Sequence, residues 1–324
     1  MSKYVLKRLL IMIPTLIAVG IIMFTLMNFV PGDPAQLALG AGTHTPAEIE
    51  MKRAALGLNR PFMVRLGEYL KNIFLHFDFG KSLIDGTEIK WELMRRFPHT
   101  FKIAIYSIVL TVVIGLPLGI YTAVKANSIG DKISLFITLL FDCMPSFWTA
   151  LLLVLLFSLK LGWLPSSGMQ HGFPDNLISL ILPTLTLGCG YAALIARTTR
   201  SSVLEVVRQD YIDMARAKGL TENAVIWKHM LKNALIPIVT VVGLNFGTLL
   251  GGSVLTESIF SWPGVGRFVV DSISYKDTPA VLGSVVTLAI LFTIVNLIVD
   301  LLYAFLDPRI KSEYQSSWKR AKKK

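Results

Sequence analysis

Residues 103–124 read IAIYSIVLTVVIGLPLGIYTAV, an uncharged run that is closed by Lys102 and Lys125. A helix that crosses a bilayer needs about 20 consecutive apolar residues, so this run is long enough to span. Backbone polar groups inside hydrocarbon must pair within their own segment, which only a helix or a closed barrel allows. The run therefore predicts a membrane-spanning helix.

Five further apolar runs of similar length occur along the chain. With the first run, they predict six spans, at 9–30, 103–124, 133–159, 177–196, 235–256 and 280–306. Only 16% of the 324 residues are charged, whereas soluble domains average about 25%. The sequence predicts an all-α integral membrane protein whose residues 1–324 form a single transmembrane domain.

Lys and Arg are concentrated in alternate connections between these spans. The connection after the fourth span holds Arg197, Arg200, Arg208, Arg216, Lys218, Lys228 and Lys232, whereas the short connections 160–176 and 259–280 hold only Lys160, Arg267 and Lys276. Basic residues favour the cytoplasmic side, so we expect a multi-pass protein with both termini in the cytoplasm. This bias accounts for the net charge of +11, and we expect no nucleic-acid partner.

The connection 31–102 is the largest segment expected on the outer face. Thr45, followed by Pro46 and then by Glu48, is the signature of a helix start, and Gly57 is a suitable end. Pro61 opens a second predicted helix, which runs to about Leu75, and a third is predicted at 87–97. We expect a small helical insertion between the first two spans.

The connection 197–235 is much longer than a link between neighbouring helices requires. Apolar residues recur at helical spacing, Gly219 supplies a turn, and Thr221 is a candidate cap for a second helix. We call residues 205–235 the elbow. The apolar stripe of the connection 197–235 consists of Leu204, Val207, Tyr211, Met214 and Ala215. The stripe either packs on the protein itself or docks into a groove on a soluble partner, and the pattern leaves both open.

Two motifs in the elbow carry a family resemblance. Residues 213–219 read DMARAKG and residues 229–237 read HMLKNALIP. Together they resemble the EAA loop of ABC importer permeases, in the form found in the peptide/nickel (dipeptide and oligopeptide) permease family. Asp213 replaces the Glu of the general loop and Met214 its first Ala, and these departures are typical of the peptide branch.

Other motifs of that family follow in the same order along the chain. They are FVPGDP at 29–34, PSFW at 145–148, GWLP at 162–165, ESIFSWPGVG at 257–266 and DPRI at 307–310. The resemblance therefore covers nearly the whole chain. It implies the ABC type I importer permease fold in the bacterial inner membrane.

The resemblance also implies a set of partners. These are a homologous second permease, two ATP-binding subunits that hold the ATP and Mg, and an extracytoplasmic solute-binding protein that docks near 31–102 and 259–280. This chain would itself bind no cofactor and have no catalytic residue. The cargo implied is a short peptide, with nickel, glutathione or another small solute as alternatives.

Within the EAA loop, the resemblance identifies the contact with the ATP-binding subunits. Asp213 would be a polar anchor, Ala215 would permit close approach and Gly219 would form the turn. The whole predicted contact set is Tyr211, Asp213, Met214, Ala215, Arg216, Ala217, Lys218, Gly219 and Leu220.

The transport path has three candidate residues, namely Asp142, Asn245 and Glu257. A carboxylate in mid-span costs about 2.5–3.5 kcal/mol on insertion scales, so Asp142 must face protein or water. It either pairs with a cation inside the bundle or lines the path and meets a peptide amino group.

Gly243, Gly247 and Gly251 recur every four residues on the fifth span. Small residues at this spacing let two helices approach closely. They form either a seam with the second permease or a contact with another helix of the same chain.

Other activities find little support in the sequence. Gly80-Lys81-Ser82 resembles the end of a P-loop, but Leu75 stands where the motif needs Gly. The five histidines show no ligand spacing, so no metal site is expected. A self-sufficient secondary transporter would normally show an internal repeat with paired acids, and an intramembrane enzyme would need a reactive constellation. Neither is visible.

Overall fold

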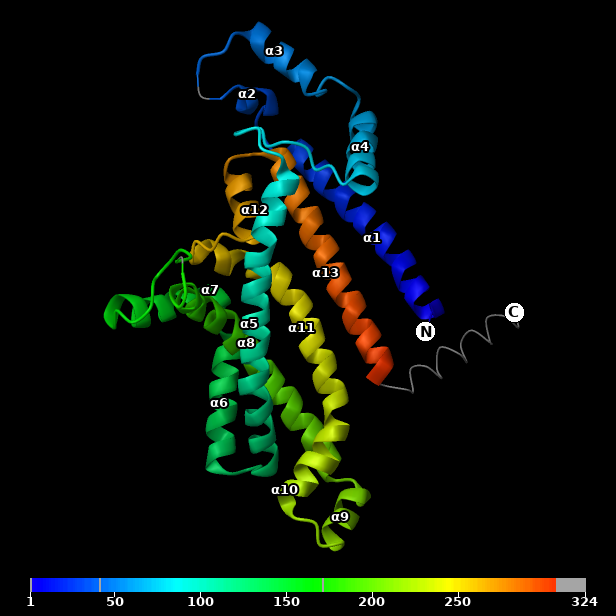
Figure 1. The fold of residues 1–324 in the computed structure, drawn as a ribbon, viewed down its shortest axis with the longest axis vertical. Coiled ribbons are helices and arrows are strands. Elements are labelled where there is room, and N and C mark those ends of the chain that lie inside the picture. The colour runs from blue at the N-terminus through cyan, green and yellow to red at the C-terminus, as the bar shows by residue number, and fades with distance from the viewer. Residues whose placement is uncertain (1, 41, 171, 307–324) are drawn as a thin grey trace, which may run out of the picture. The chain divides into compact units, whose positions relative to one another are not determined.

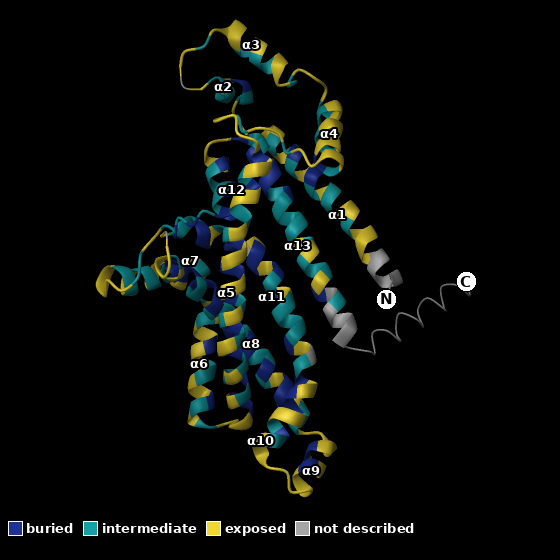
Figure 2. Ribbon diagram, in the orientation of Figure 1, coloured by how far each residue is buried: buried dark blue, intermediate teal, exposed yellow. Residues whose placement is uncertain are grey.

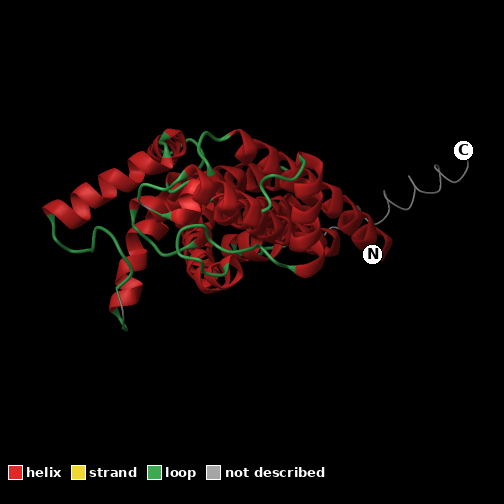
Figure 3. Ribbon diagram, turned by 90° about the horizontal axis from the view of Figure 1, so that it is seen from above, coloured by secondary structure: helices red, strands yellow, loops and turns green. Residues whose placement is uncertain are grey.

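The structure is a computed structural model that describes residues 2–40, 42–170 and 172–306 (Figure 1). Within these ranges the chain is helical apart from its connections and one isolated antiparallel bridge between Lys81 and Glu88. Figure 3 shows the same alternation of helices and loops. The predicted all-α class is confirmed. The motif at 307–310 lies outside the described residues.

Four helices are long and apolar enough to cross a membrane unaided. They are α1 (Ser2–Phe29), α5 (Ile89–Val124), α8 (Asp175–Val207) and α13 (Thr278–Leu306). Two further candidate spans are bent pairs of helices, and counting each pair once gives six in the described chain. The predicted number of spans is thus reached only when the bent pairs are included.

The third predicted span is not continuous. It consists of α6 (Ile129–Cys143), then α7 (Ser146–Leu153) and the π-helical segment η2 (Val154–Lys160), with a bend of 106° between them. Met144 at the bend is extended, with φ −78° and ψ 127°. A residue before proline is disfavoured in the helical region, and Pro145 follows here. The span predicted at 133–159 is therefore a bent pair of helices rather than one continuous helix.

Two helices extend beyond their predicted spans. α5 already begins at Ile89, so the separate helix predicted at 87–97 is part of α5. α8 continues to Val207, past Arg197, where the sequence predicted the fourth span to stop. Arg197 ends the apolar run but not the helix, because arginine has a high helix propensity.

The chain divides into two compact units, which are described separately here. The first comprises Met1–Val5, Ile103–Leu249 and the chain from Ile294 onward. In it α5 packs closely on α8 through two glycines. A Cβ on Gly115 would lie 2.7 Å from the carbonyl oxygen of Ala192, and one on Gly119 would lie 2.5 Å from that of Ala196. Such distances leave room for no side chain at either position.

The second unit comprises Leu6–Lys102 and Leu250–Thr293. Its short helices are α2 (Pro34–Leu39), α3 (Pro46–Ala55), α4 (Phe62–Lys71), the π-helical η1 (Asn72–His76) and α12 (Val265–Ser274). The predicted capping box of α3 is confirmed, since Thr45 and Glu48 exchange hydrogen bonds of 3.3 and 2.7 Å. Gly57, with φ +68°, follows the end of the same helix, as predicted.

Candidate functional site

The elbow lies within the first unit and is built from three short helical pieces (Figure 1). α8 ends at Val207, and α9 (Asp210–Ala217) follows after a two-residue break. Gly219 adopts φ +79°, a conformation that glycine reaches without strain. α10 (Glu222–Ala224) and the π-helical η3 (Val225–Met230) then lead into α11 (Leu231–Ile259). The predicted helix, glycine turn and second helix are confirmed.

The apolar side of the elbow is covered by the chain itself. Ile212 and Ala215 of α9 are buried against Val225 and Met230 of η3. The rest of this cluster is Ala123, Val203, Ala234 and Ile238. Of the predicted stripe, Ala215 is buried and Leu204 and Val207 pack on this cluster, whereas Tyr211 and Met214 are exposed, so packing on the chain accounts for part of it and docking stays open for the rest. The elbow is therefore a braced element rather than a loose loop.

The opposite side of the elbow remains exposed (Figure 2). Tyr211 is 40% exposed, Met214 59% and Leu220 42%. Eight of the nine predicted contact residues are exposed here: Tyr211, Asp213, Met214, Arg216, Ala217, Lys218, Gly219 and Leu220. Ala215, at 6% exposure, lies in the elbow's own core, so its small size serves internal packing.

Polar contacts fix the shape of the exposed side. Arg216 pairs with Glu222 across the glycine turn, with Nη2 2.8 Å from Oε1, and also with Asp213 at 3.4 Å. Asn233 donates to the Tyr211 hydroxyl at 2.7 Å. These contacts join α9 to the start of α10 and to α11, so the exposed residues keep their relative positions.

Asp142 pairs with a cation of the same chain. Arg197 Nη2 lies 2.8 Å from Asp142 Oδ2, and the two side chains are 34% and 33% exposed. One turn further along α8, Arg200 donates to both oxygens of Asp131, from Nε at 3.0 Å and from Nη2 at 2.9 Å. Sequence reasoning noticed Arg197 and Arg200 only as loop charges. Their spacing of three residues was the signal that they share a helix face.

The fifth-span glycines have different surroundings. A Cβ on Gly243 would lie 2.5 Å from Val299 Cγ1, so this glycine serves a contact within the chain. Gly247 is buried, whereas Gly251 is exposed and a Cβ there would meet no atom within 4 Å. Asn245 is 7% exposed, and its Nδ2 has no hydrogen-bond partner among the described residues.

Glu257 lies in the second unit and is fully buried. Its Oε1 accepts from Ser253 Oγ at 3.0 Å, and its Oε2 accepts from the backbone N–H of Arg267 at 3.0 Å. The Trp262 indole donates to the His99 carbonyl at 3.0 Å, which ties the same connection to α5. In this arrangement Glu257 anchors residues 258–267 and faces no open space.

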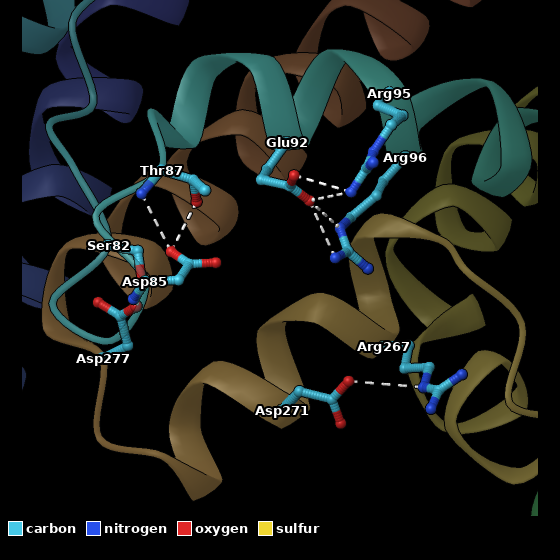
Figure 4. Close-up of polar contacts among 9 residues, drawn as sticks. All are labelled: Ser82, Asp85, Thr87, Glu92, Arg95, Arg96, Arg267, Asp271 and Asp277. Atoms are coloured by element: carbon cyan, nitrogen blue, oxygen red, sulfur yellow. Dashed lines mark hydrogen bonds and ion pairs between the residues drawn. The ribbon is translucent and has the colours of Figure 1, made fainter. Parts of the chain in front are cut away.

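More polar contacts hold the connections of the second unit in place (Figure 4). Ser82 donates to Asp277 at 2.5 Å, which joins the segment before α5 to the start of α13. Glu92 pairs with Arg95 and Arg96 at 2.8 and 2.9 Å, and Arg267 lies 3.5 Å from Asp271. No group of three or more His, Cys, Asp or Glu residues in the described ranges could hold a metal ion.

Comparison with solved structures supports the fold. The chain resembles the MetNI methionine ABC transporter in inward-facing conformations, with TM-scores of 0.53 and 0.56 and sequence identities of 22% and 23%. In both cases the likeness covers 67% of this chain and 97% of the other. At these identities the comparison shows the shared permease fold alone.

Sequence relatives cover almost the entire chain. A dipeptide transport system permease protein, DppB, from Alkalihalophilus pseudofirmus is 42% identical over 96% of this chain and 100% of its own length. A glutathione transport system permease protein, GsiC, from Pectobacterium atrosepticum is 42% identical over 96% and 99%. The GsiC of Escherichia coli K12 is 41% identical over the same shares.

Two family descriptions match successive parts of the chain. The N-terminal domain of binding-protein-dependent transport system membrane components matches residues 1–104. The binding-protein-dependent transport system inner membrane component matches residues 115–312. With the elbow, the spans and the full-length relatives, these matches show that the chain belongs to the permease family of binding-protein-dependent ABC importers.

Proposed function

We propose that this chain forms, with a homologous second permease, the path by which an ABC importer carries short peptides into the cytoplasm. The three relatives described above carry names of peptide systems, for dipeptides and for glutathione, which is itself a tripeptide. The chain lies in the bacterial inner membrane with both termini in the cytoplasm, in keeping with its distribution of basic residues.

The observation that carries this proposal is the braced elbow. Its buried core includes Ile212, Ala215 and Val225, and its other side presents Tyr211, Asp213 and Met214 to solvent. Transmission of motion requires an element that keeps its shape while its position changes. We assign the exposed side as the seat for one of two partner subunits that bind and hydrolyse ATP with Mg. The chain itself is non-catalytic.

The other predicted sites are the docking region for the binding protein, the path residues and the seam with the second permease. A solute-binding protein docks outside at 31–102 and 259–280, whose polar contacts are described above. Asp142 and Asn245 are our path candidates. For Glu257 we now propose a structural role, because its carboxylate is buried and bonded. Gly251 is our candidate for the seam with the second permease, since a Cβ there would have no neighbouring atom of the described residues within 4 Å.

Reconstitution of the whole complex tests the proposal. Proteoliposomes that contain both permeases and both ATPases, with the binding protein outside, should take up di- and tripeptides only when ATP is enclosed. Uptake of free amino acids and of longer peptides gives the length preference. Peptide uptake without the ATPases, or uptake of nickel with no uptake of peptides, would overturn it.

The orientation is tested separately in intact cells. In a chain whose own two cysteines are replaced, Leu220→Cys should react with a membrane-impermeant thiol reagent only after the cells are opened. Leu220 suits the test because it is 42% exposed in this chain. Reaction in unopened cells would place the elbow on the wrong side of the membrane for an ATPase.

A further inference from the structure

Two ion pairs join α8 to α6, and they differ in a way that suggests different roles. Arg200 and Asp131 make two hydrogen bonds, and the Asp131 side chain is only 2% exposed. The backbone N–H of Asn127 also donates to Asp131, at 2.8 Å. Arg197 and Asp142 make a single contact of 2.8 Å, with about a third of each side chain exposed. The first pair is closed, whereas the second is open to other partners.

Arg197 of the open pair lines an open cavity of about 590 Å³. Ser201 and Glu205 of α8 follow it at one-turn spacing, and Arg208, directly after α8, completes this side of the lining. Its other lining residues are Leu135, Arg200, Leu204 and Gln209. The opposite side of α8 is buried. Sites for small molecules typically measure about 300–1,000 Å³, so a short peptide fits.

Arg197, Arg200 and Arg208 lie beyond the fourth apolar run, at the cytoplasmic end of the bundle, where charged side chains face either protein or water. The lining carries three guanidinium groups and one carboxylate, and it is open in this chain. We propose that this face of α8 lines the water-filled path, and that Asp142 and Arg197 together bind the free termini of a passing peptide. The inference rests on the proposed function and names the two groups that recognise the cargo.

Exchange of partners explains how an ion pair can serve as a binding site. Removing one partner of this ion pair leaves the charge of the other side chain without a counter-charge. A zwitterionic peptide avoids this loss, because its ammonium group replaces Arg197 beside Asp142 and its carboxylate replaces Asp142 beside Arg197. A solute with one charge, or with blocked termini, would leave one side chain unpaired. The site therefore selects small zwitterions.

Protection from thiol labelling tests the site in the assembled complex in nanodiscs. Cys143 and Cys189 are replaced, and Ser201→Cys is introduced into the cavity lining. A charged thiol reagent should label this cysteine, and a free dipeptide at millimolar concentration should slow labelling at least threefold. The same dipeptide with an acetylated N-terminus and an amidated C-terminus should give no protection. Asp142→Asn and Arg197→Gln should each abolish protection, and Asp142→Glu should retain it.

Two control variants distinguish recognition of the peptide termini from stabilisation of the contact between α6 and α8. Lys132→Gln removes a charge from α6 outside the cavity, and it should leave protection intact. Asp131→Asn breaks the closed pair, so it should lower the melting temperature while any complex that assembles stays protected by the free dipeptide. Loss of protection in Lys132→Gln to the extent seen in Asp142→Asn would mean that general charge, not recognition, is responsible.

Each other outcome is decisive as well. No labelling without peptide would show that another subunit covers this face, and the inference would fail. Equal protection by free and blocked peptides would rule out recognition of the termini. ATP-driven peptide uptake is measured on the same purified wild-type complex after reconstitution into proteoliposomes, so loss of the inference with uptake preserved leaves the proposed function standing. Absence of any peptide uptake would overturn the proposed function itself.

Discussion

Arg216 donates two hydrogen bonds to Glu222 across the Gly219 turn, with Nη2 2.8 Å from Oε1 and Nε 3.2 Å from Oε2. Their side chains are 38% and 51% exposed, and exposed pairs contribute about 0–1 kcal/mol to stability. The Arg216–Glu222 pair therefore affects the shape of the elbow more than its stability. It sets the angle at which α9 presents its exposed side.

The Gly219 turn should be sensitive to a side chain for conformational reasons alone. At φ +79° an Ala costs roughly 1–2 kcal/mol relative to Gly, although nothing lies within 4 Å of its Cβ position. We expect Gly219→Ala to weaken the binding of ATPase subunits to the purified permease pair about three- to tenfold, as measured by surface plasmon resonance.

A matched control exists for this variant. Gly86 has φ +69° and also has open space around its Cβ position, but it lies in the other unit. Gly86→Ala should introduce similar strain and leave ATPase binding unchanged. Equal effects of the two variants would show that general destabilisation, not the elbow, is being measured.

The buried and exposed sides of α9 should respond differently to truncation. Ile212 is fully buried, so Ile212→Ala should destabilise the permease by about 2–4 kcal/mol and lower its melting temperature. Met214→Ala, at a site 59% exposed, should leave the melting temperature unchanged and reduce ATPase binding. Unaltered ATPase binding in Met214→Ala would remove this residue from the contact.

Close packing of α5 on α8 predicts intolerance at Gly119. A Cβ there would also lie 2.5 Å from Thr199 Cβ, so Gly119→Ala must push the helices apart and should cost about 1–3 kcal/mol. Gly251→Ala should leave the stability of this chain unaltered and weaken its association with the second permease. Native mass spectrometry of the permease pair measures that association. Intact association in Gly251→Leu would contradict a seam at this residue.

Asp33 supplies a prediction for pH. Partial burial raises the pKa of Asp33, but hydrogen bonds from Arg53 at 2.8 Å and from the Ala35 N–H at 3.0 Å lower it more, so its pKa falls below the ordinary 3.8. Because the pKa of Asp33 is lower in the folded state, its ionised carboxylate stabilises the fold at pH values above the ordinary pKa. This stabilisation is lost as the pH falls through the lowered pKa. The α2–α3 arrangement should therefore be constant between pH 8 and pH 5.

Hydrogen exchange at pH 7 measures this contribution directly. Asp33→Asn removes the charge and should speed exchange in peptides that cover 34–55. Glu50→Gln, at an exposed site that accepts from Asn59, is the control and should leave α2 unchanged. Identical exchange in wild type and Asp33→Asn would show that the pair does not order these helices.

Much of the fold follows from local sequence signals. Uncharged runs predicted the spans, the Thr45 capping box predicted the start of α3, and Gly219 predicted the turn of the elbow. Each depends on residues close together in the chain. Pro145 is also a local signal for the bend at Met144, but the long apolar run around it predicts a single span.

What escaped prediction depends on contacts between distant segments. The spacing of Arg197 and Arg200 indicates a shared helix face, but the pairing of Arg197 with Asp142 requires α6 and α8 to lie together. Gly115 and Gly119 stand four residues apart, yet only packing against Ala192 and Ala196 shows why. Ala215 was predicted as a contact residue, and its burial depends on η3, which follows the turn.

The continuity of α8 has a mechanical consequence. From Thr184 to Val207 the helix contains no proline and, at 1.5 Å per residue, measures about 36 Å. A tilt of only about 5° at its elbow end would displace the other end by about 3 Å. Because both arginine pairs join α8 to α6, the two helices would tilt together. A small rotation at the cytoplasmic end of α8 would therefore produce a larger displacement of its far end within the bilayer.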